Sequence, residues 1–292
     1  MVLLMKIVIN FTILFYALST TGYISYLFFQ KNFLHKIGLY LLTTGFFFHT
    51  SFIGYRFIQI GYMPVYNLHE TLLIAGWAIA CVFLAFQYKF HLKILGVYAA
   101  PLTALITTTA YFLPSEPAQT QKVFKSFWLI FHVIVIFMGD ASFALACGLG
   151  ILYLLQENAI KNKNHGFFFR RLPSLDLLDT TGYACIVAGF TMLTLGLVTG
   201  FVYAKTVWGR FWDWDPKEVW SGITWLLYAA LLHERLAVGW RGRKSAIMSI
   251  IGFAVLLFTF LGVNFFLEGH HGIFTQWYRP KYPHNPLFLE SP

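Results

Sequence analysis

The stretch WGRFWDWDPKEVW, residues 208–220, holds four of the chain's nine tryptophans and connects two long apolar runs, 183–204 and 219–238. Each run has about the 20 residues that an α-helix needs to cross a bilayer. Between them, indole rings alternate with charged groups, which belong at or outside the membrane surface. The stretch therefore predicts two consecutive membrane helices joined by a tryptophan-rich loop in water.

The second of these helices has a defined start. Asp215 fits the N-cap position, Pro216 the first helical position and Glu218 the third, as in a capping box. The loop before it, about residues 205–218, is expected to lie outside the membrane. It carries three tryptophans ahead of the helix: Trp208, Trp212 and Trp214.

The whole composition is that of a membrane protein. Of 292 residues, 58% are hydrophobic and 11% charged, whereas a soluble domain carries roughly 25% charged residues. The first apolar run is longer than the core of a signal peptide and is interpreted as a helix. Six further runs qualify as spans: 7–29, 37–55, 68–87, 94–113, 126–155 and 246–267. We expect an all-α polytopic protein of about eight transmembrane helices, forming a single domain over residues 1–292.

Basic residues are distributed unevenly among the connections. Those after the first, third, fifth and seventh runs hold 12 of 21 basic residues and four of 12 acidic residues. Because positively charged loops stay in the cytoplasm, these connections are predicted to be cytoplasmic. Both termini and the tryptophan loop then face outward. The net charge of +9 is explained in this way, and no nucleic-acid partner is expected.

The cysteines exclude several kinds of chemistry. The three cysteines, Cys81, Cys147 and Cys185, all lie in apolar runs, and none forms a C-x-x-C pair. Neither a disulfide framework nor a thiol redox motif is therefore indicated. The chain also lacks C-x-x-C-H, the sequence to which c-type haem is attached.

The concentration of tryptophans in one loop indicates a flat conjugated ligand. Indole faces stack on such rings with about 1 kcal/mol per contact beyond burial. Arg210 and Lys217 could pair with anionic groups such as porphyrin propionates. The alternatives are an interfacial aromatic belt for the tryptophans and ordinary snorkelling for the two basic side chains.

Histidines near the outer side are candidate ligands of a haem iron. His132 lies near the outer end of the run 126–155, and His270 and His271 follow the last run. Neutral imidazole is a good axial ligand, and a hydrogen bond to its second nitrogen fixes the tautomer. One histidine from each region could hold haem from both faces. Taken singly, a histidine at a helix end is more often structural.

Two further histidines lie inside predicted helices. His233 is near the inner end of the run 219–238, about 15 residues of helix from the loop. It is a candidate for a second, inner haem site, or it snorkels together with its charged neighbours. His49 has no evident partner, and a structural role is predicted for it.

Residues 208–218 are similar to the tryptophan-rich WWD motif of haem-handling proteins in cytochrome c maturation. Within that superfamily the chain most resembles the CcsA (ResC) family, a subunit of the two-component cytochrome c synthase. Two further segments carry the resemblance: 64–70, which reads P-x-x-N-x-x-E, and 263–271, which contains V-N and G-H-H. The similarity covers nearly the whole chain.

The resemblance implies a function and a set of site residues. Such a subunit delivers haem b and attaches it, through thioether bonds, to an apocytochrome c that offers CxxCH. His132 and His271 would be the axial ligands, and His233 would form an inner site with a membrane partner of the CcsB (ResB) type. No catalytic residue is implied. The motif also implies Trp208, Trp212, Trp214 and Asp215 as haem-binding residues, and Arg210 is added as a candidate on account of its charge.

Three other functions remain open from the sequence. A haem exporter would deliver its cargo without forming thioether bonds. An electron-transfer cytochrome with b-type haem needs paired histidines at membrane depth, whereas His49 and His233 lie toward opposite leaflets. A structural membrane subunit would bind no pigment.

Overall fold

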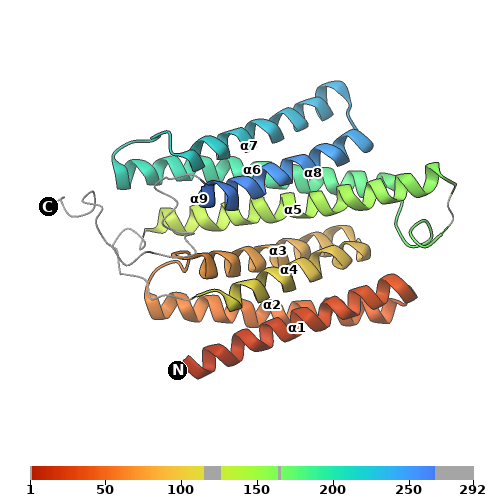
Figure 1. The fold of residues 1–292 in the computed structure, drawn as a ribbon, viewed down its shortest axis with the longest axis horizontal. Coiled ribbons are helices and arrows are strands. Elements are labelled where there is room, and N and C mark those ends of the chain that lie inside the picture. Colours follow the sequence, from red (N-terminus) through yellow and green to blue (C-terminus); the bar gives the residue numbers. More distant parts are fainter. Residues whose placement is uncertain (1, 115–125, 164–165, 267–292) are drawn as a thin grey trace.

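The structure is a computed structural model that describes residues 2–114, 126–163 and 166–266. Within these ranges every regular element is helical (Figure 1). The long helices are α1 (Val2–Phe29), α2 (Asn32–Ile60), α3 (Leu68–Phe90), α4 (Gly96–Phe112), α5 (Phe127–Lys161), α6 (Leu175–Trp208), α7 (Pro216–His233) and α8 (Arg243–Leu257). The short elements are the 3-10 turn η1 (Lys93–Leu95), the π turns η3 (Glu234–Val238) and η4 (Phe258–Gly262), and α9 (Val263–Phe266).

The long helices run back and forth along one direction (Figure 1). Helices α1 to α4 pack together, as do α5 to α8, and α3 against α5 joins the two groups. One end of the bundle carries the loop 209–215, the start of α1 and the start of α5, and we name it the tryptophan end. The opposite end carries the connections 162–174 and 239–242, and we name it the basic end.

The expected all-α polytopic fold is confirmed. Within the described ranges, seven helices are long and apolar enough to span a membrane, where about eight were predicted. Helix α7 occupies the eighth position and runs alongside the others (Figure 1). It is not among the seven, because its 18 residues begin with the polar turn that follows Asp215.

Hydropathy underestimated the length of α5 and α6. The expected connection 156–182 shrinks to 162–174, because α5 continues to Lys161 and α6 begins at Leu175, where Ser174 accepts a hydrogen bond from the Leu177 N–H. The 35 residues of α5 measure about 50 Å, well beyond the roughly 30 Å of a hydrocarbon core. Apolar patterning detects only the part of a helix inside lipid, so the polar ends were missed.

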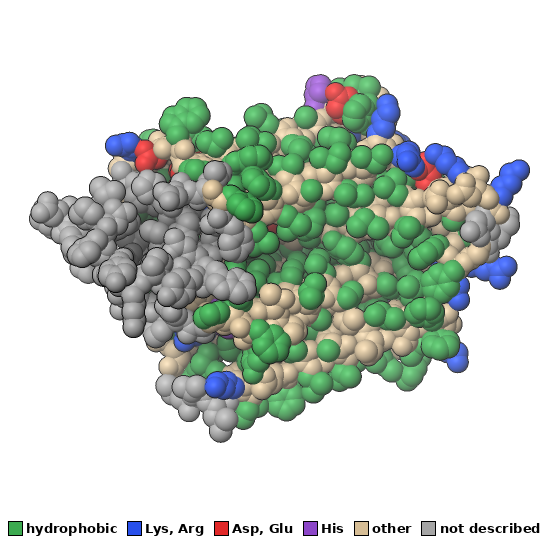
Figure 2. Space-filling model, viewed as in Figure 1, with side chains coloured by type: hydrophobic (Ala, Val, Ile, Leu, Met, Phe, Trp, Pro, Cys, Tyr) green, Lys and Arg blue, Asp and Glu red, His purple; other side chains and the backbone are tan. Residues whose placement is uncertain are grey.

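Lysine and arginine side chains gather at the basic end, and the flank of the bundle is covered by apolar side chains (Figure 2). The uneven distribution of basic residues along the sequence therefore corresponds to a difference in charge between the two ends of the bundle. An apolar flank between charged ends is the surface of an integral membrane protein. Which end faces the cytoplasm remains a prediction.

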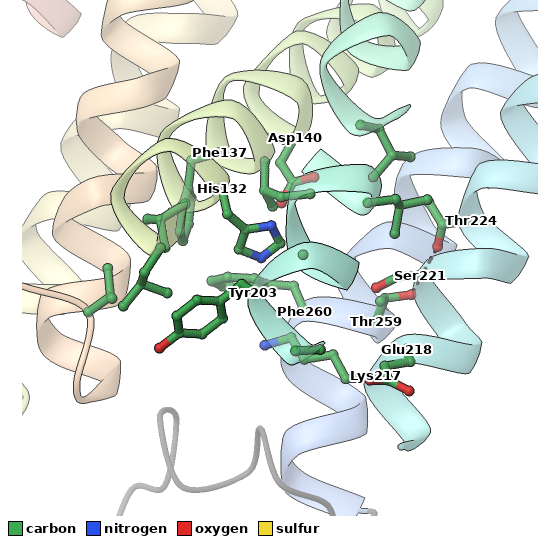
Figure 3. A pocket seen from close by; sticks show the side chains of 18 of the residues that line it. His132, Phe137, Asp140, Tyr203, Lys217, Glu218, Ser221, Thr224, Thr259 and Phe260 are labelled. Carbon is green, nitrogen blue, oxygen red and sulfur yellow. Dashed lines mark hydrogen bonds between the residues drawn. The ribbon is translucent and has the colours of Figure 1, made fainter. Parts of the chain in front are cut away.

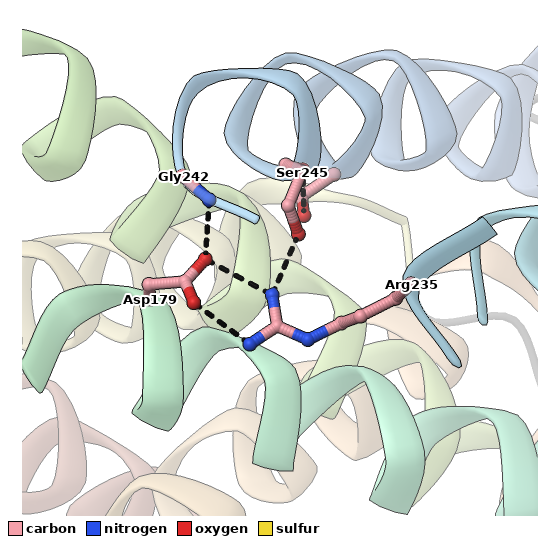
Figure 4. A network of polar contacts seen from close by, with 5 residues as sticks. Asp179, Arg235, Gly242 and Ser245 are labelled. Atoms are coloured by element: carbon pink, nitrogen blue, oxygen red, sulfur yellow. Dashed lines mark hydrogen bonds and ion pairs between the residues drawn. The ribbon is translucent and has the colours of Figure 1, made fainter. Parts of the chain in front are cut away.

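A buried ionic cluster holds the basic end together (Figure 4). Arg235 of η3 donates to both carboxylate oxygens of Asp179 in α6, at 3.0 and 2.7 Å. The Gly242 N–H, just before α8, donates to the same carboxylate at 2.9 Å. Both charged side chains are about 10% exposed, at 8% and 12%. The cluster ties α6 to the connection between α7 and α8.

Candidate functional site

A pocket of about 220 Å³ lies between α5, α6, α7 and η4 near the tryptophan end (Figure 3). Its wall is largely apolar, and the connection before α3 contributes Val65. Three charged residues line it together with His132: Asp140, which is also on α5, and the neighbours Lys217 and Glu218 on α7. A concave apolar site with a few convergent polar groups is the usual form of a ligand pocket.

The His132 imidazole is held in a defined orientation. Its Nδ1 lies 2.8 Å from the carbonyl oxygen of Gly196 in α6. A carbonyl oxygen only accepts, so Nδ1 carries the proton and the lone pair of the neutral ring is on Nε2. Metal-ligating histidines are oriented by this kind of bond. The tautomer therefore suits iron coordination through Nε2, on the wall of the pocket.

Glycines let α5 and α6 approach closely and still leave room for this ring. A Cβ at Gly139 would meet the Gly189 carbonyl oxygen at 3.2 Å, so the two backbones nearly touch. Small residues permit such contacts between membrane helices. A Cβ at Gly200 would meet Cε1 of His132 at 2.8 Å. Glycine at 200 is therefore a steric requirement of the imidazole position.

The Gly200→Ala variant is expected to displace the His132 ring. Overpacking of this kind costs about 1–3 kcal/mol, and we expect it to appear as weaker haem binding in a titration followed by absorbance. The matched control is Gly54→Ala in α2, where a Cβ would meet nothing within 4 Å. Equal haem affinity of the two variants would contradict the proposed packing.

The tryptophan loop has a strained backbone, and one of its indole rings packs against the pocket wall. Gly209, with φ of 74°, ends α6, and Trp214 is a non-glycine residue with φ of 57°. Such a conformation costs an L-residue about 1–2 kcal/mol, and Trp214 is 77% exposed. Trp212 packs edge-on against Trp214 and against Phe201 of the pocket wall, both with ring centroids 5.7 Å away. The loop therefore joins the pocket directly.

The predicted start of α7 is confirmed with one difference. Asp215 is buried and accepts from the Lys217 N–H at 2.9 Å. The Glu218 carboxylate accepts from the Asp213 N–H at 3.0 Å rather than from the N-cap residue, so it ties down the loop as well as the helix. Arg210 pairs with Asp213 at 2.7 Å and is 70% exposed. Its guanidinium is therefore committed to the loop surface.

Asp140 is the site residue that the sequence analysis missed. It lies in the middle of α5, two helical turns beyond His132 and on the same side of the helix, and it lines the pocket. The signal was present, because a carboxylate inside a long apolar run is costly and indicates function. Lys217 was noted as a possible anion partner, and it lines the same pocket.

The P-x-x-N-x-x-E element supports the pocket from α3. Asn67 caps α3 by accepting from the Glu70 N–H at 2.9 Å. Glu70 pairs with Arg56 at 3.2 Å, and the buried Glu70 also accepts from the Tyr66 N–H. This network fixes the connection that brings Val65 to the pocket.

The structure describes only some of the other predicted site residues. His271 and its neighbour His270 lie outside the described residues, as does the side chain of Trp208. His233 is exposed at the end of α7, at the basic end, away from His132. Among the described residues no cluster of three metal-ligating side chains occurs. His49, to which no partner had been assigned, is fully buried 3.2 Å from the Tyr16 hydroxyl, which agrees with a structural role.

Fold and site together define an all-α integral membrane protein with an aromatic loop over a histidine-lined pocket at one end. The chain belongs to the cytochrome c assembly protein family, whose sequence pattern matches residues 65–271. Helices α1 and α2 precede the matched range.

Proteins named cytochrome c biogenesis protein CcsA are similar to most of the chain. That of Guillardia theta is 34% identical over 243 residues, covering 76% of this chain and 80% of that protein. That of Mesostigma viride is 31% identical, covering 86% and 90%. That of Chlamydomonas reinhardtii is 36% identical, but the match spans 62% of its length.

A solved structure shares the fold. The cytochrome c haem lyase CcmF superposes with a TM-score of 0.64 at 14% identity. The match covers 93% of this chain and 48% of the CcmF chain. At this identity the likeness concerns the arrangement of helices alone.

Proposed function

We propose that this protein delivers haem b to an apocytochrome c and supports its attachment at the tryptophan end of the bundle. Membership of the cytochrome c assembly family supports a role in cytochrome c maturation. The proposal that haem is held at the tryptophan end rests on the His132 imidazole. The Gly196 carbonyl orients this ring on the wall of a pocket that the tryptophan loop adjoins.

The size of the pocket supports a peripheral position for the haem ring. Pockets that enclose drug-sized ligands have volumes of about 300–1,000 Å³, whereas this one has about 220 Å³. A porphyrin therefore inserts only part of itself and leaves an edge accessible, which is what an enzyme that must present a vinyl group to a polypeptide requires. In this proposal the indoles of Trp212 and Trp214 cover the exposed part, and His271 supplies the second axial ligand.

Attachment needs positioning and no nucleophile from this chain. Each cysteine thiol of CxxCH adds across one haem vinyl group: the sulfur bonds to one vinyl carbon and the proton goes to the other. The addition is redox-neutral overall. Holding the two reactants in one orientation is the main contribution that a protein can make to such a step.

We further propose that the tryptophan end faces a periplasm or thylakoid lumen, with the basic end in the cytoplasm or stroma. This follows from the concentration of basic side chains at the other end (Figure 2). At the basic end His233 is exposed on the flank of α7, where a membrane partner of the CcsB type could contribute a second ligand to an inner haem site.

Reconstitution with an apocytochrome peptide tests the proposed attachment. The purified protein, together with a CcsB-type partner, is expected to show a haem absorption spectrum and to convert a CxxCH peptide into a product that keeps haem after acid and acetone extraction. A peptide with both cysteines replaced by serine is the control. Haem that reaches the peptide but extracts completely would instead identify a haem exporter, and the absence of pigment would overturn both functions.

A further inference from the structure

Two opposite charges face each other across the pocket without direct contact. Asp140 of α5 and Lys217 of α7 both line it, on either side of His132 (Figure 3). Their charges attract one another, yet no ion pair within 4.0 Å joins these two described residues. Both side chains are partly buried, so without direct contact each loses part of its hydration and the pair gains only part of its Coulomb energy. Such an arrangement is poorly explained by stability alone.

Lys217 is the one lysine or arginine among the residues that line the pocket. Its ammonium group lies 6.0 Å from the centre of the Phe260 ring and is also attracted by Asp215. Two other basic side chains lie at the loop: Arg210 pairs with Asp213, and Lys205 donates to the Gly209 carbonyl oxygen, and neither lines the pocket. Among the described residues, Lys217 is therefore the cation available to an anionic group that enters the pocket.

Among the described residues that line the pocket, the other charged side chains are acidic. Glu218, next to Lys217 on α7, lines the pocket, but its carboxylate accepts the Asp213 N–H and is held by the loop. Asp140 makes no such bond to the loop and lies deeper, among the apolar side chains of α5 and α6. The polar groups from α6 and η4, those of Tyr203 and Thr259, carry no charge. Asp140 is thus the counter-charge that a ligand carboxylate must replace.

We propose that Asp140 is the internal counter-charge of Lys217, and that this pocket captures a porphyrin carboxylate by exchanging Asp140 for the ligand's carboxylate as the partner of the Lys217 ammonium. This inference rests on the proposed function and assigns the carboxylate subsite within it. The exchange makes capture reversible, because the ligand carboxylate is repelled by Asp140 and the attraction between Asp140 and Lys217 returns on release. A moderate affinity suits a site that transfers its ligand to another protein.

The proposal predicts effects of opposite sign for the two residues. Asp140→Asn removes the repulsion at nearly constant volume and is expected to tighten binding of a porphyrin dicarboxylate several-fold. Lys217→Met removes the cation and is expected to weaken it by about tenfold, the usual consequence of losing a charged hydrogen-bond partner. A purely structural role would give weaker binding in both variants.

The experiment uses iron-free protoporphyrin IX, whose binding does not depend on axial ligation, and its dimethyl ester, which lacks the carboxylates. Affinities are measured by fluorescence quenching on the purified full chain in nanodiscs, as the ratio of diacid to diester for each variant. Lys6→Gln is the matched control, because Lys6 is exposed on α1 at the same end. This substitution removes a positive charge without changing the pocket. We expect the ratio to rise in Asp140→Asn, fall in Lys217→Met and stay constant in the control.

The exchange would be overturned if the diacid-to-diester affinity ratio of Asp140→Asn were equal to or below that of the wild type. It would also be overturned if the substitutions changed the affinity for the diester as much as the affinity for the diacid. Haem binding through His132 is measured separately by its absorption spectrum. A protein that binds haem through His132 but shows no tightening in Asp140→Asn loses this inference alone. Opposite shifts of the porphyrin ratio in a protein whose haem spectrum is indifferent to His132 would keep the inference and overturn the proposed ligation.

Discussion

Alanine at position 132 is expected to remove most of the bound haem. His132 is the imidazole whose tautomer is fixed for coordination by the Gly196 carbonyl, 2.8 Å from its Nδ1. Loss of a metal ligand costs more than loss of its supporting bonds, which already lowers affinity by about 10–100-fold. The purified His132→Ala protein should therefore carry at least about tenfold less haem, measured by the Soret absorbance per protein. Added imidazole should restore part of it.

The matched control is His69→Ala. The His69 ring, at the start of α3, makes the same kind of contact, with Nδ1 2.7 Å from the carbonyl oxygen of Ala110 near the end of α4. It does not line the pocket. We expect its haem content to stay near the wild-type value. Normal haem content and normal c-type cytochrome output in His132→Ala would show that the axial assignment is wrong.

The second large effect is expected at the other end of the bundle. Replacing Asp179 with alanine leaves the Arg235 guanidinium, 8% exposed, without its carboxylate. Breaking a buried ion pair by removing one partner costs about 3–5 kcal/mol, because the remaining charge is buried without compensation. We expect Asp179→Ala to lower the free energy of unfolding by that amount in a denaturant titration of the purified protein.

A surface pair at the same end provides the comparison. Lys161 is 61% exposed and pairs with Glu157 at 2.9 Å, so Lys161→Ala should cost less than about 1 kcal/mol. The double variant Asp179→Ala/Arg235→Ala removes both buried charges and should be more stable than the single aspartate variant. An Asp179→Ala protein as stable as Lys161→Ala would contradict a structural role for this ion pair.

The helical fold could be predicted because its determinants are local. Apolar runs of about 20 residues specify membrane helices, and the start of α7 follows from Asp215 and Pro216 alone. The pair between Arg56 and Glu70 was also accessible, since both residues flank the same short connection. The outer parts of α5 and α6 were not, because helix propensity and capping extend a helix into water without an apolar signal.

The arrangement of the site depends on packing that the sequence does not display. The contact of His132 with Gly196 joins residues 64 positions apart, and it exists because Gly200 leaves space for the ring. The position of Asp140 in an apolar run indicates function from the sequence, but its relation to Lys217 depends on the packing of α5 against α7 around the pocket. The roles of His271, Trp208 and His233 stay predictions. His271 and the side chain of Trp208 lie outside what the structure describes, and His233 lies at the opposite end of the bundle from the pocket.

The wall of the pocket formed by the π turn η4 depends on the number of residues in that turn. A π turn contains one residue more than the α-helix around it, because each hydrogen bond spans five residues instead of four. Thr259 and Phe260 face the pocket from within this turn. Because the wider turn accommodates this extra residue, loss of one residue there would restore ordinary α-helix and leave the facing of Val263 and its neighbours nearly unchanged. The extra residue thus decides which side chains this turn presents to the pocket.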